Sequence, residues 1–413
     1  MTDWREVEGG VTAPKGFRAA GITAGLKPSG APDLALILSD ADAIAAGVFT
    51  TSQVRAACVD YCRDRLEAKT TARAILCNAG QANACTGTQG WEDAVDSANT
   101  LAAALNISAD KVLLASTGVI GQRIKIDALK AGIPNLITAL SDSGNDAAAQ
   151  AIVTTDLVPK SYALEMTLGD RPVRVGGISK GSGMIHPNMA TMLAFVTCDA
   201  SVSPHLWQDM LQRAADRSFN QITVDGDTST NDSLIALANG ESRTPAITEM
   251  GPAVEKLEAM LTEVCIYLAK AIARDGEGAT CLLEISVSGT VNDAAACQIA
   301  RTVAGSSLVK SAVFGRDPNW GRIAGAAGRA GVPFEQDELR VQLGEIVLMD
   351  KGQPLPFDRS AASTYLTTAA EGDYLKTDTV AIAISVGSGP GQGIAWGCDL
   401  SYDYVRINAE YTT

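Results

Sequence analysis

The sequence predicts a mixed α/β fold, and three features of the chain support this. Short apolar runs that end in glycine, asparagine or serine recur along the sequence and are typical of buried strands. Between them, apolar residues are spaced three and four apart, as in amphipathic helices. Hydrophobic residues make up 46% and charged residues 19% of the 413, which is the balance of a folded α/β protein rather than a disordered chain.

Apolar runs with different patterns predict the strands. LALILSD, ARAILCNAG and KVLLASTG (34–40, 72–80 and 111–118) each stop at turn-forming residues, and we expect them to be buried strands. CLLEISVSG (281–289) alternates apolar and polar residues, as a half-exposed strand does. TVAIAISVG (379–387) is apolar enough to be buried on both faces.

Two helices are predicted with defined starts or ends. One should begin at Ser203, because Pro204 suits a first helical turn and the following apolar residues share one face. The other covers 254–272, where an apolar residue recurs every three or four positions until Gly276 closes the pattern. A soft break near residue 290 predicts a smaller C-terminal unit.

Charge excludes two classes of partner. Lys and Arg number 33 against 47 Asp and Glu, so the formal net charge is −14, and the protein repels phosphate backbones and anionic lipid heads. We therefore expect no nucleic acid and no membrane partner. The N-terminus is polar and acidic, and no run approaches the roughly 18 apolar residues of a membrane span. These features predict a cytoplasmic protein.

The cysteines and histidines favour neither disulfides nor a metal site. The nine cysteines are odd in number and contain no CxxC pair, so we expect reduced thiols. With only two histidines, a zinc cage would need mostly thiolates at irregular spacings. No metal and no cofactor is predicted.

The most unusual stretch is GGISKGSGMIHPNMATMLAFVTCDA (176–200). A glycine-rich turn containing Lys180 should lead through Pro187 into a strand that begins near Ala190. The spacing of a phosphate-binding P-loop is absent. Taken alone, the stretch is most simply a loop followed by a buried strand.

Cleavage of the chain before Thr191 would give this stretch a chemical role. Two histidines leave little material for a Ser-His-Asp triad, so another base is needed. A threonine with a free α-amine carries its own base, whose unperturbed pKa is about 7.7 to 8.0. The small Ala190 and the flexible approach would let the Thr191 hydroxyl attack the Ala190 carbonyl and form an ester that water opens.

KGSGMIHPNMATML resembles the cleavage-site signature of the arginine-biosynthesis ornithine acetyltransferase family, also called glutamate N-acetyltransferase. The resemblance covers essentially the whole chain. It continues through GVFTTSQVRAA, NAGQANACTG, STGVIG, TTDLVPK, FNQITVDGDTSTNDS, ARDGEGAT, FGRDPNWGRI and the C-terminal WGCDLSYDYVRINAEYTT.

This resemblance implies a layered α/β sandwich with a smaller C-terminal α/β unit. It implies an α chain of residues 1–190 and a β chain of residues 191–413. Within the β chain, about 191–290 would complete the main sandwich and about 290–413 would form the C-terminal unit. The family also assembles two α and two β chains, so a heterotetramer is expected.

The resemblance assigns roles to individual residues. Thr191 would be the nucleophile and acetyl acceptor, with the oxyanion hole at Thr117 and Gly118. Glycine there permits close approach of the backbone. Both acetylornithine and glutamate carry an α-carboxylate, which suits a cation, and ornithine carries an ammonium, which suits a carboxylate. Substrate contacts would fall on Thr154, Lys180, Thr191, Glu277, Asn408 and Thr413.

Two other runs and one histidine carry weaker signals. DGDTSTND (225–232) begins like a calcium loop, but Thr230 replaces the required glycine and Ala236 the required glutamate. GSGPGQG (387–393) lacks dinucleotide-binding spacing and predicts a tight turn. His186 lies near Thr191 in sequence, but the family mechanism does not require it.

The expected reaction is ping-pong acetyl transfer from N2-acetylornithine through acetyl-Thr191 to glutamate. Acetyl-CoA is a further candidate donor, because bifunctional members of the family use it. An amidase or aminopeptidase with the same threonine nucleophile would instead pass the acyl group to water. A non-catalytic amino-acid-binding protein would keep an intact backbone and form no acetyl-enzyme.

Overall fold

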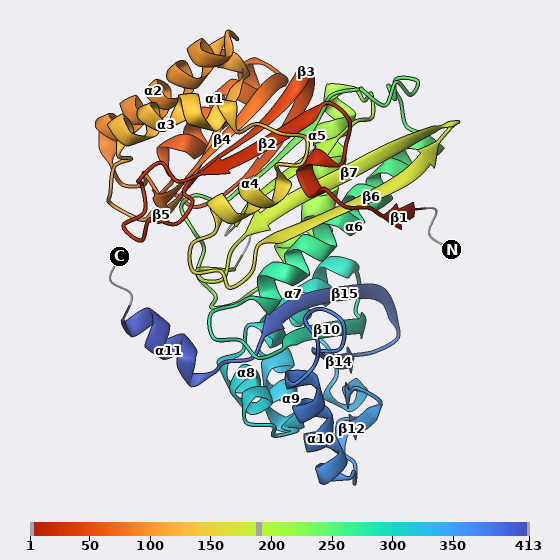
Figure 1. Ribbon diagram of the computed structural model, residues 1–413. Helices are drawn as coiled ribbons and strands as arrows, with labels where there is room; N and C mark the ends of the chain where they lie inside the picture. The colour runs from red at the N-terminus through yellow and green to blue at the C-terminus, as the bar shows by residue number, and fades with distance from the viewer. Residues whose placement is uncertain (1–3, 187–191, 411–413) are drawn as a thin grey trace. The chain divides into compact units, whose positions relative to one another are not determined.

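The computed structural model describes residues 4–186 and 192–410, and the chain divides into two compact units. The first unit comprises Met1–Gly181, Pro187–Asn220 and Asp227–Leu268, and the second comprises Ser182–His186, Gln221–Gly226 and Ala269–Thr413. Each unit has its own β-sheet and its own hydrophobic core (Figure 1). The mixed α/β class predicted from the sequence is confirmed.

A nine-stranded sheet forms the centre of the first unit, with strand order β1-β6-β7-β8-β9-β3-β4-β5 and β2 beside β3. The pairs β8–β9 and β4–β5 are parallel, and the other pairs are antiparallel. The strands are β1 (Trp4–Glu6), β2 (Phe17–Ile22), β3 (Leu34–Phe49), β4 (Thr71–Gln81), β5 (Val112–Val119), β6 (Lys160–Leu168), β7 (Arg171–Lys180), β8 (Leu193–Cys198) and β9 (Ser233–Ala238).

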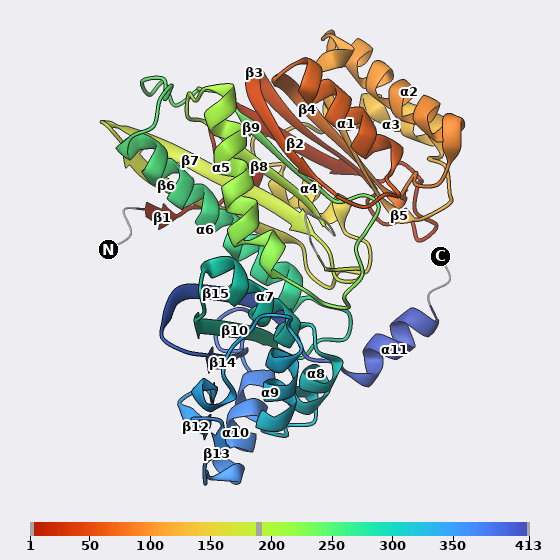
Figure 2. The same ribbon diagram turned by 180° about the vertical axis from the view of Figure 1, so that it is seen from behind.

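Helices cover both faces of this sheet. Figures 1 and 2 show α4 on one face, with α5 and α6 on the other. Trp207 of α5 is fully buried and donates its indole N–H to the Ala236 carbonyl of β9. The helices that begin in this unit are α1 (Ala57–Ala68), α2 (Gly87–Leu105), α3 (Ile126–Thr138), α4 (Asn145–Ile152), α5 (Pro204–Arg217) and α6 (Pro252–Arg274), and the last residues of α6 belong to the second unit.

A six-stranded sheet forms the second unit, with strand order β13-β12-β11-β14-β10-β15. Helix α7 packs closely on β15, since a Cβ on Gly393 would lie 2.4 Å from the Cys297 nitrogen. The elements are α7 (Asp293–Ala304), α8 (Ser307–Phe314), α9 (Trp320–Gly328), α10 (Arg359–Ala370), α11 (Tyr402–Ala409), β10 (Leu282–Gly289), β11 (Arg340–Leu343), β12 (Ile346–Asp350), β13 (Gln353–Pro354), β14 (Thr379–Ser385) and β15 (Gly389–Cys398).

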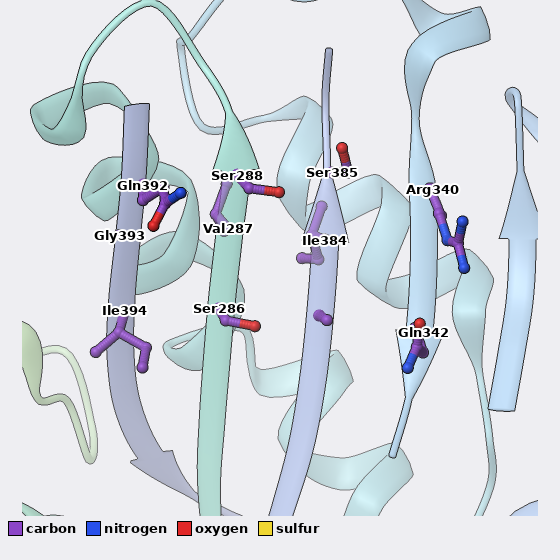
Figure 3. Close-up of a pocket in the computed structure, with 11 residues that line it drawn as sticks. Ser286, Val287, Ser288, Arg340, Gln342, Ile384, Ser385, Gln392, Gly393 and Ile394 are labelled. Atoms are coloured by element: carbon purple, nitrogen blue, oxygen red, sulfur yellow. The ribbon is translucent and has the colours of Figure 1, made fainter. Parts of the chain in front are cut away.

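The other face of the second sheet carries a shallow hollow of about 690 Å³ (Figure 3). Polar and apolar residues line it in similar measure, and the polar ones lie on four strands. Ser286 and Ser288 of β10, Arg340 of β11, Ser385 of β14 and Gln392 of β15 contribute to it. This face therefore resembles the water-facing side of a sheet that has one covered face.

The predicted helices are confirmed: α5 starts at Pro204 after Ser203, and α6 covers 252–274. The strand prediction for 379–387 was right in type but wrong in burial. In β14 alternate residues are buried and the intervening ones are partly exposed, because helices cover one face of that sheet.

The prediction of a turn at Lys180 was also wrong. Lys180 is the last residue of β7, and the preceding glycines lie inside the strand. A Cβ on Gly176 would lie 1.8 Å from the Gly10 carbonyl oxygen, and one on Gly177 would lie 2.8 Å from Leu268 Cδ1. These glycines therefore permit close packing rather than a turn. The predicted strand start near Ala190 lies outside the described residues, and β8 is described from Leu193.

Candidate active site

Thr117 and Gly118 lie near the end of β5, as predicted, where this strand runs parallel to β4. Gly118 pairs with Gly80, and both have positive φ angles, of 129° and 126°. A Cβ on Gly118 would lie 2.3 Å from the Gly80 carbonyl carbon. Only glycine fits this backbone, because it tolerates positive φ and leaves room for the neighbouring strand.

Lys180 joins two of the other predicted residues. Its ammonium donates to Thr154 Oγ1 at 2.9 Å and to Thr117 Oγ1 at 3.2 Å. An ammonium can only donate, so both threonine oxygens act as acceptors in these bonds. Each hydroxyl hydrogen is then available for another acceptor. For Thr117 this acceptor can be an oxyanion beside the Gly118 backbone.

Asp156 contacts several groups of this cluster through its carboxylate. The sequence analysis did not predict it as a site residue. Its buried carboxylate accepts from Lys160 Nζ at 2.7 Å, from the Gly181 N–H at 2.6 Å and from the Thr154 N–H at 3.0 Å. Lys180 Nζ is 4.0 Å from the same carboxylate. Burial alone would raise the pKa of Asp156, but the two lysine charges and the hydrogen bonds outweigh it and hold the pKa below its usual value.

A second buried carboxyl, Asp232, comes directly before β9. The residue is 3% exposed, and its Oδ2 has no hydrogen-bond partner among the described residues. Burial raises its pKa well above the usual value, against the opposing effects of the Met192 N–H and the Lys180 charge. Met192 follows Thr191 in the chain, so this buried carboxyl accepts a hydrogen bond from the residue next to the predicted nucleophile.

Two further predicted residues meet in the second unit. Asn408 of α11 donates from Nδ2 to Glu277 Oε2 at 2.7 Å. The Glu277 N–H is bound to the Ser182 carbonyl at 3.0 Å, and a Cβ on Gly183 would lie 2.6 Å from the Glu277 carboxyl. The carboxylate is therefore fixed by its own backbone and by one amide side chain.

Three of the remaining predicted residues lie outside the part of the chain that the structure describes, and His186 lies inside it. Ala190, Thr191 and Thr413 lie outside the described residues. His186 Nδ1 is 3.0 Å from Thr223 Oγ1 within the second unit. None of the predicted site residues that the structure describes lines the polar hollow of Figure 3.

Two features were not found among the described residues, a cluster of metal-ligand side chains and a helix that could span a membrane. Among residues 4–186 and 192–410, no group of three or more His, Cys, Asp or Glu side chains could hold a metal ion. Within the same ranges, no helix is both long enough and apolar enough to cross a membrane.

Lys180 lies against two threonine hydroxyls, beside a strand end that only glycine fits, and hydroxyl and backbone N–H groups are the kind of donors that acyl-transferring enzymes use to stabilise an oxyanion. The ArgJ family model matches residues 18–413. The chain belongs to the ArgJ family and is an acetyltransferase of arginine biosynthesis. This membership confirms the resemblance seen in the sequence motifs.

Close relatives extend over the whole chain. It is 76% identical over 413 residues to the arginine biosynthesis bifunctional protein ArgJ 1 of Nostoc sp., and 72% identical to the ArgJ protein of Synechocystis sp., each match covering 100% of both chains. The crystal structure of the ArgJ protein of Bacillus halodurans is 42% identical with a TM-score of 0.50, over 52% of this chain and 98% of the solved chain.

Proposed function

We propose that this enzyme transfers an acetyl group from N2-acetylornithine to glutamate through an acetyl ester on Thr191. The observation that carries the proposal is the contact of Lys180 with Thr117, which leaves the Thr117 hydroxyl hydrogen able to donate beside Gly118. Donors aimed at a developing oxyanion are usually the largest single contribution in acyl transfer.

In the first half-reaction the Thr191 hydroxyl oxygen attacks the acetyl carbonyl carbon, and its proton passes to the Thr191 α-amine. The oxyanion accepts from the Thr117 hydroxyl and the Gly118 N–H. The C–N bond then breaks, and the α-ammonium returns the proton to the leaving nitrogen of ornithine. In the second half-reaction the glutamate amine attacks the ester carbonyl carbon, and the ester C–O bond breaks. The proton lost by the amine passes through the Thr191 α-amine to the Thr191 oxygen, which gives N-acetylglutamate and the free threonine.

The substrates' charges suit the two clusters. A lysine ammonium has three N–H donors, and Lys180 uses two on threonines, so one remains for a substrate α-carboxylate. Glu277, fixed by Asn408, suits the ornithine ammonium. Thr154 and the C-terminal Thr413 complete the proposed contacts. Acetyl-CoA is proposed as a second donor, because the relatives named bifunctional match the full chain.

The proposed nucleophile requires cleavage between Ala190 and Thr191. Residues 191–413 number 413 − 190 = 223, about half of the chain. The solved Bacillus halodurans chain also aligns with about half of this one, whereas the curated relatives match its full length. This difference is expected if members of the family divide into two pieces, and it supports the cleavage. An assembly of two α and two β chains is proposed from the family resemblance.

We further propose that the enzyme works in the cytoplasm. All nine cysteines are free thiols in the structure, and seven of them are buried. Unpaired thiols are typical of a reducing compartment.

Intact mass and N-terminal sequencing of the purified protein, combined with an acetyl-transfer assay, test the proposal. Two pieces, the larger beginning Thr-Met-Leu, and N-acetylglutamate as the main product are expected. Thr191→Ala should stay uncut and inactive. An active Thr191→Ala protein would refute the nucleophile, dominant release of acetate would favour an amidase, and an uncut inactive wild type would favour a binding protein.

A further inference from the structure

The segment DGDTSTND (225–232), which the proposed reaction does not use, carries a buried amide, Asn231, just before its last residue, and this amide contacts β5. Asn231 is 5% exposed. Its Nδ2 donates to the Ala82 carbonyl at 2.6 Å and to the Ser116 carbonyl at 2.8 Å, while its Oδ1 accepts from the Thr230 hydroxyl at 2.6 Å. Both amide hydrogens are therefore committed to two backbone carbonyls.

Hydrogen bonds hold the carbonyls on both sides of the Thr117–Gly118 pair, those of Ser116 and Val119. Ser116 comes directly before Thr117, and the Val119 carbonyl, directly after Gly118, accepts from the Ala82 N–H at 2.9 Å. Asn231 therefore closes a ring of hydrogen bonds through Ala82, Val119 and Ser116. Thr117 and Gly118, the two predicted oxyanion donors, therefore lie in the part of this ring between the Ser116 and Val119 carbonyls, and a hydrogen bond holds each of these carbonyls.

Holding a carbonyl fixes more than one atom. The Ser116 carbonyl and the Thr117 N–H belong to one rigid peptide plane, so the orientation of that plane sets where the Thr117 side chain begins. Gly118 is the residue in this stretch with the most backbone freedom, because it lacks a Cβ. Without the anchor at Ser116, the orientation of both donors would depend on the pairing of β5 with β4 alone.

We infer that Asn231 is a positioning residue that fixes the backbone of the oxyanion hole. It touches neither substrate nor nucleophile in this role, and it acts through the Ser116 and Ala82 carbonyls. The inference rests on the proposed function, because the hole matters only if Thr117 and Gly118 stabilise an acyl-transfer oxyanion.

A buried asparagine elsewhere in the first unit provides a matched control. Asn145, at the start of α4, is 4% exposed, and its amide is also saturated: Nδ2 donates to Ser161 Oγ and Asp146 Oδ1, and Oδ1 accepts from the Val11 N–H. Asn145→Ala should lower thermal stability and leave kcat within about twofold of wild type. It separates loss of a buried amide from loss of the oxyanion anchor.

The test compares Asn231→Ala with Asn145→Ala and with the double variant Asn231→Ala/Thr117→Ala. Asn231→Ala should lower kcat about 10²-fold, near the loss for one oxyanion donor, with KM for glutamate changed less than threefold. In the Thr117→Ala background the same change should cost less than tenfold, because residues that act through one group are not additive. Additive losses, or lower stability with unchanged kcat, would overturn the inference.

Thr230→Val covers the case in which Asn231→Ala does not fold. It keeps the side-chain shape but removes the hydroxyl that orients Asn231 Oδ1, and it should lower kcat about threefold to tenfold in a folded protein; an unchanged kcat contradicts the inference. Wild-type protein without acetyl transfer would instead refute the proposed function. Active wild type with a dead Thr191→Ala but normal Asn231 and Thr230 variants would refute this inference alone.

Discussion

At the scale of single residues, the Thr117 hydroxyl is a donor because of its neighbour. The Lys180 ammonium donates to a lone pair of Thr117 Oγ1, so the hydroxyl hydrogen of Thr117 must point toward another acceptor. Removing the hydroxyl should lower kcat for acetyl transfer by about 10² to 10³ while the protein stays folded. Steady-state kinetics of Thr117→Ala test this, with Thr117→Ser, which keeps the hydroxyl, as the control. Equal losses in both variants would show that the methyl group matters rather than the hydroxyl.

Asp156 should make stability depend on acid pH. Its pKa is lowered in the folded state, so the carboxylate contributes stability above the unfolded pKa of about 3.8, and this contribution is lost as the pH falls below that value. Asp156→Asn removes the carboxylate charge that faces the buried Lys160 ammonium and should cost about 3–5 kcal/mol at pH 7. Urea unfolding of both proteins from pH 7 to pH 2.5 should show their difference shrinking below about pH 3.8. A difference that does not change with pH contradicts the assignment.

Asp232 should show the opposite sign. Its folded pKa is raised, so folding favours the protonated form, and stability falls as the pH rises from the unfolded pKa through the folded one. Asn has the same shape and no charge. The free energy of unfolding of Asp232→Asn, relative to wild type, should therefore increase between pH 4 and pH 8. A flat or falling difference would mean that the carboxylate is compensated in solution.

At the scale of elements, the approach of β4 and β5 depends on Gly118. Gly121 offers a control three residues away, since its φ is also positive, at 83°, but a Cβ there would meet nothing within 4 Å. Gly121→Ala should cost about 1–2 kcal/mol from backbone strain alone. Gly118→Ala should cost more than that, because the Cβ also overlaps the Gly80 carbonyl, and it should abolish acetyl transfer. Denaturant unfolding measures both, and equal losses would show that the strands can separate at little cost.

Sequence patterns located most elements of the fold but not their packing. The spacing of apolar residues found α5 and α6, since one helix face is readable from neighbours three and four apart. The glycines of β7 suggested a turn, because nothing local shows that Gly10 and Leu268 press against them. The burial of β14 depends on which face of the sheet the helices cover, and the strand's own composition does not contain that information.

Sequence motifs identified residues that prove to be in contact, but they did not identify residues whose contacts come from distant parts of the chain. Thr117, Thr154 and Lys180 were identified from motifs, and they meet in the structure. The contacts of Asn231, the positioning residue inferred above, could not be predicted, because its partners Ala82 and Ser116 lie 149 and 115 residues away. Its signal is a polar pair directly before an apolar strand, which is as common in turns as in sites.

At the scale of the whole molecule, the proposed cleavage would divide a single sheet. Strands β8 and β9, from the second piece, lie between β7 and β3, from the first. Six residue pairs join β8 to β7, and six join β9 to β3. The second piece therefore supplies the middle of the sheet, and the first piece supplies both sides.

This interleaving predicts that the pieces stay together after cleavage. Separation would expose both edges of β8–β9 and open the first unit's core, which has the cost of unfolding rather than of dissociation. Native size exclusion should give one species, and a denaturing gel should give two bands of about 20 and 23 kDa from the 42.8 kDa chain. Residues 1–190 and 191–413 should each fail to fold when expressed alone, because each lacks strands that the other supplies. A soluble, cooperatively folding 191–413 piece would contradict this, since it would show that β8 and β9 do not need β7 and β3 beside them.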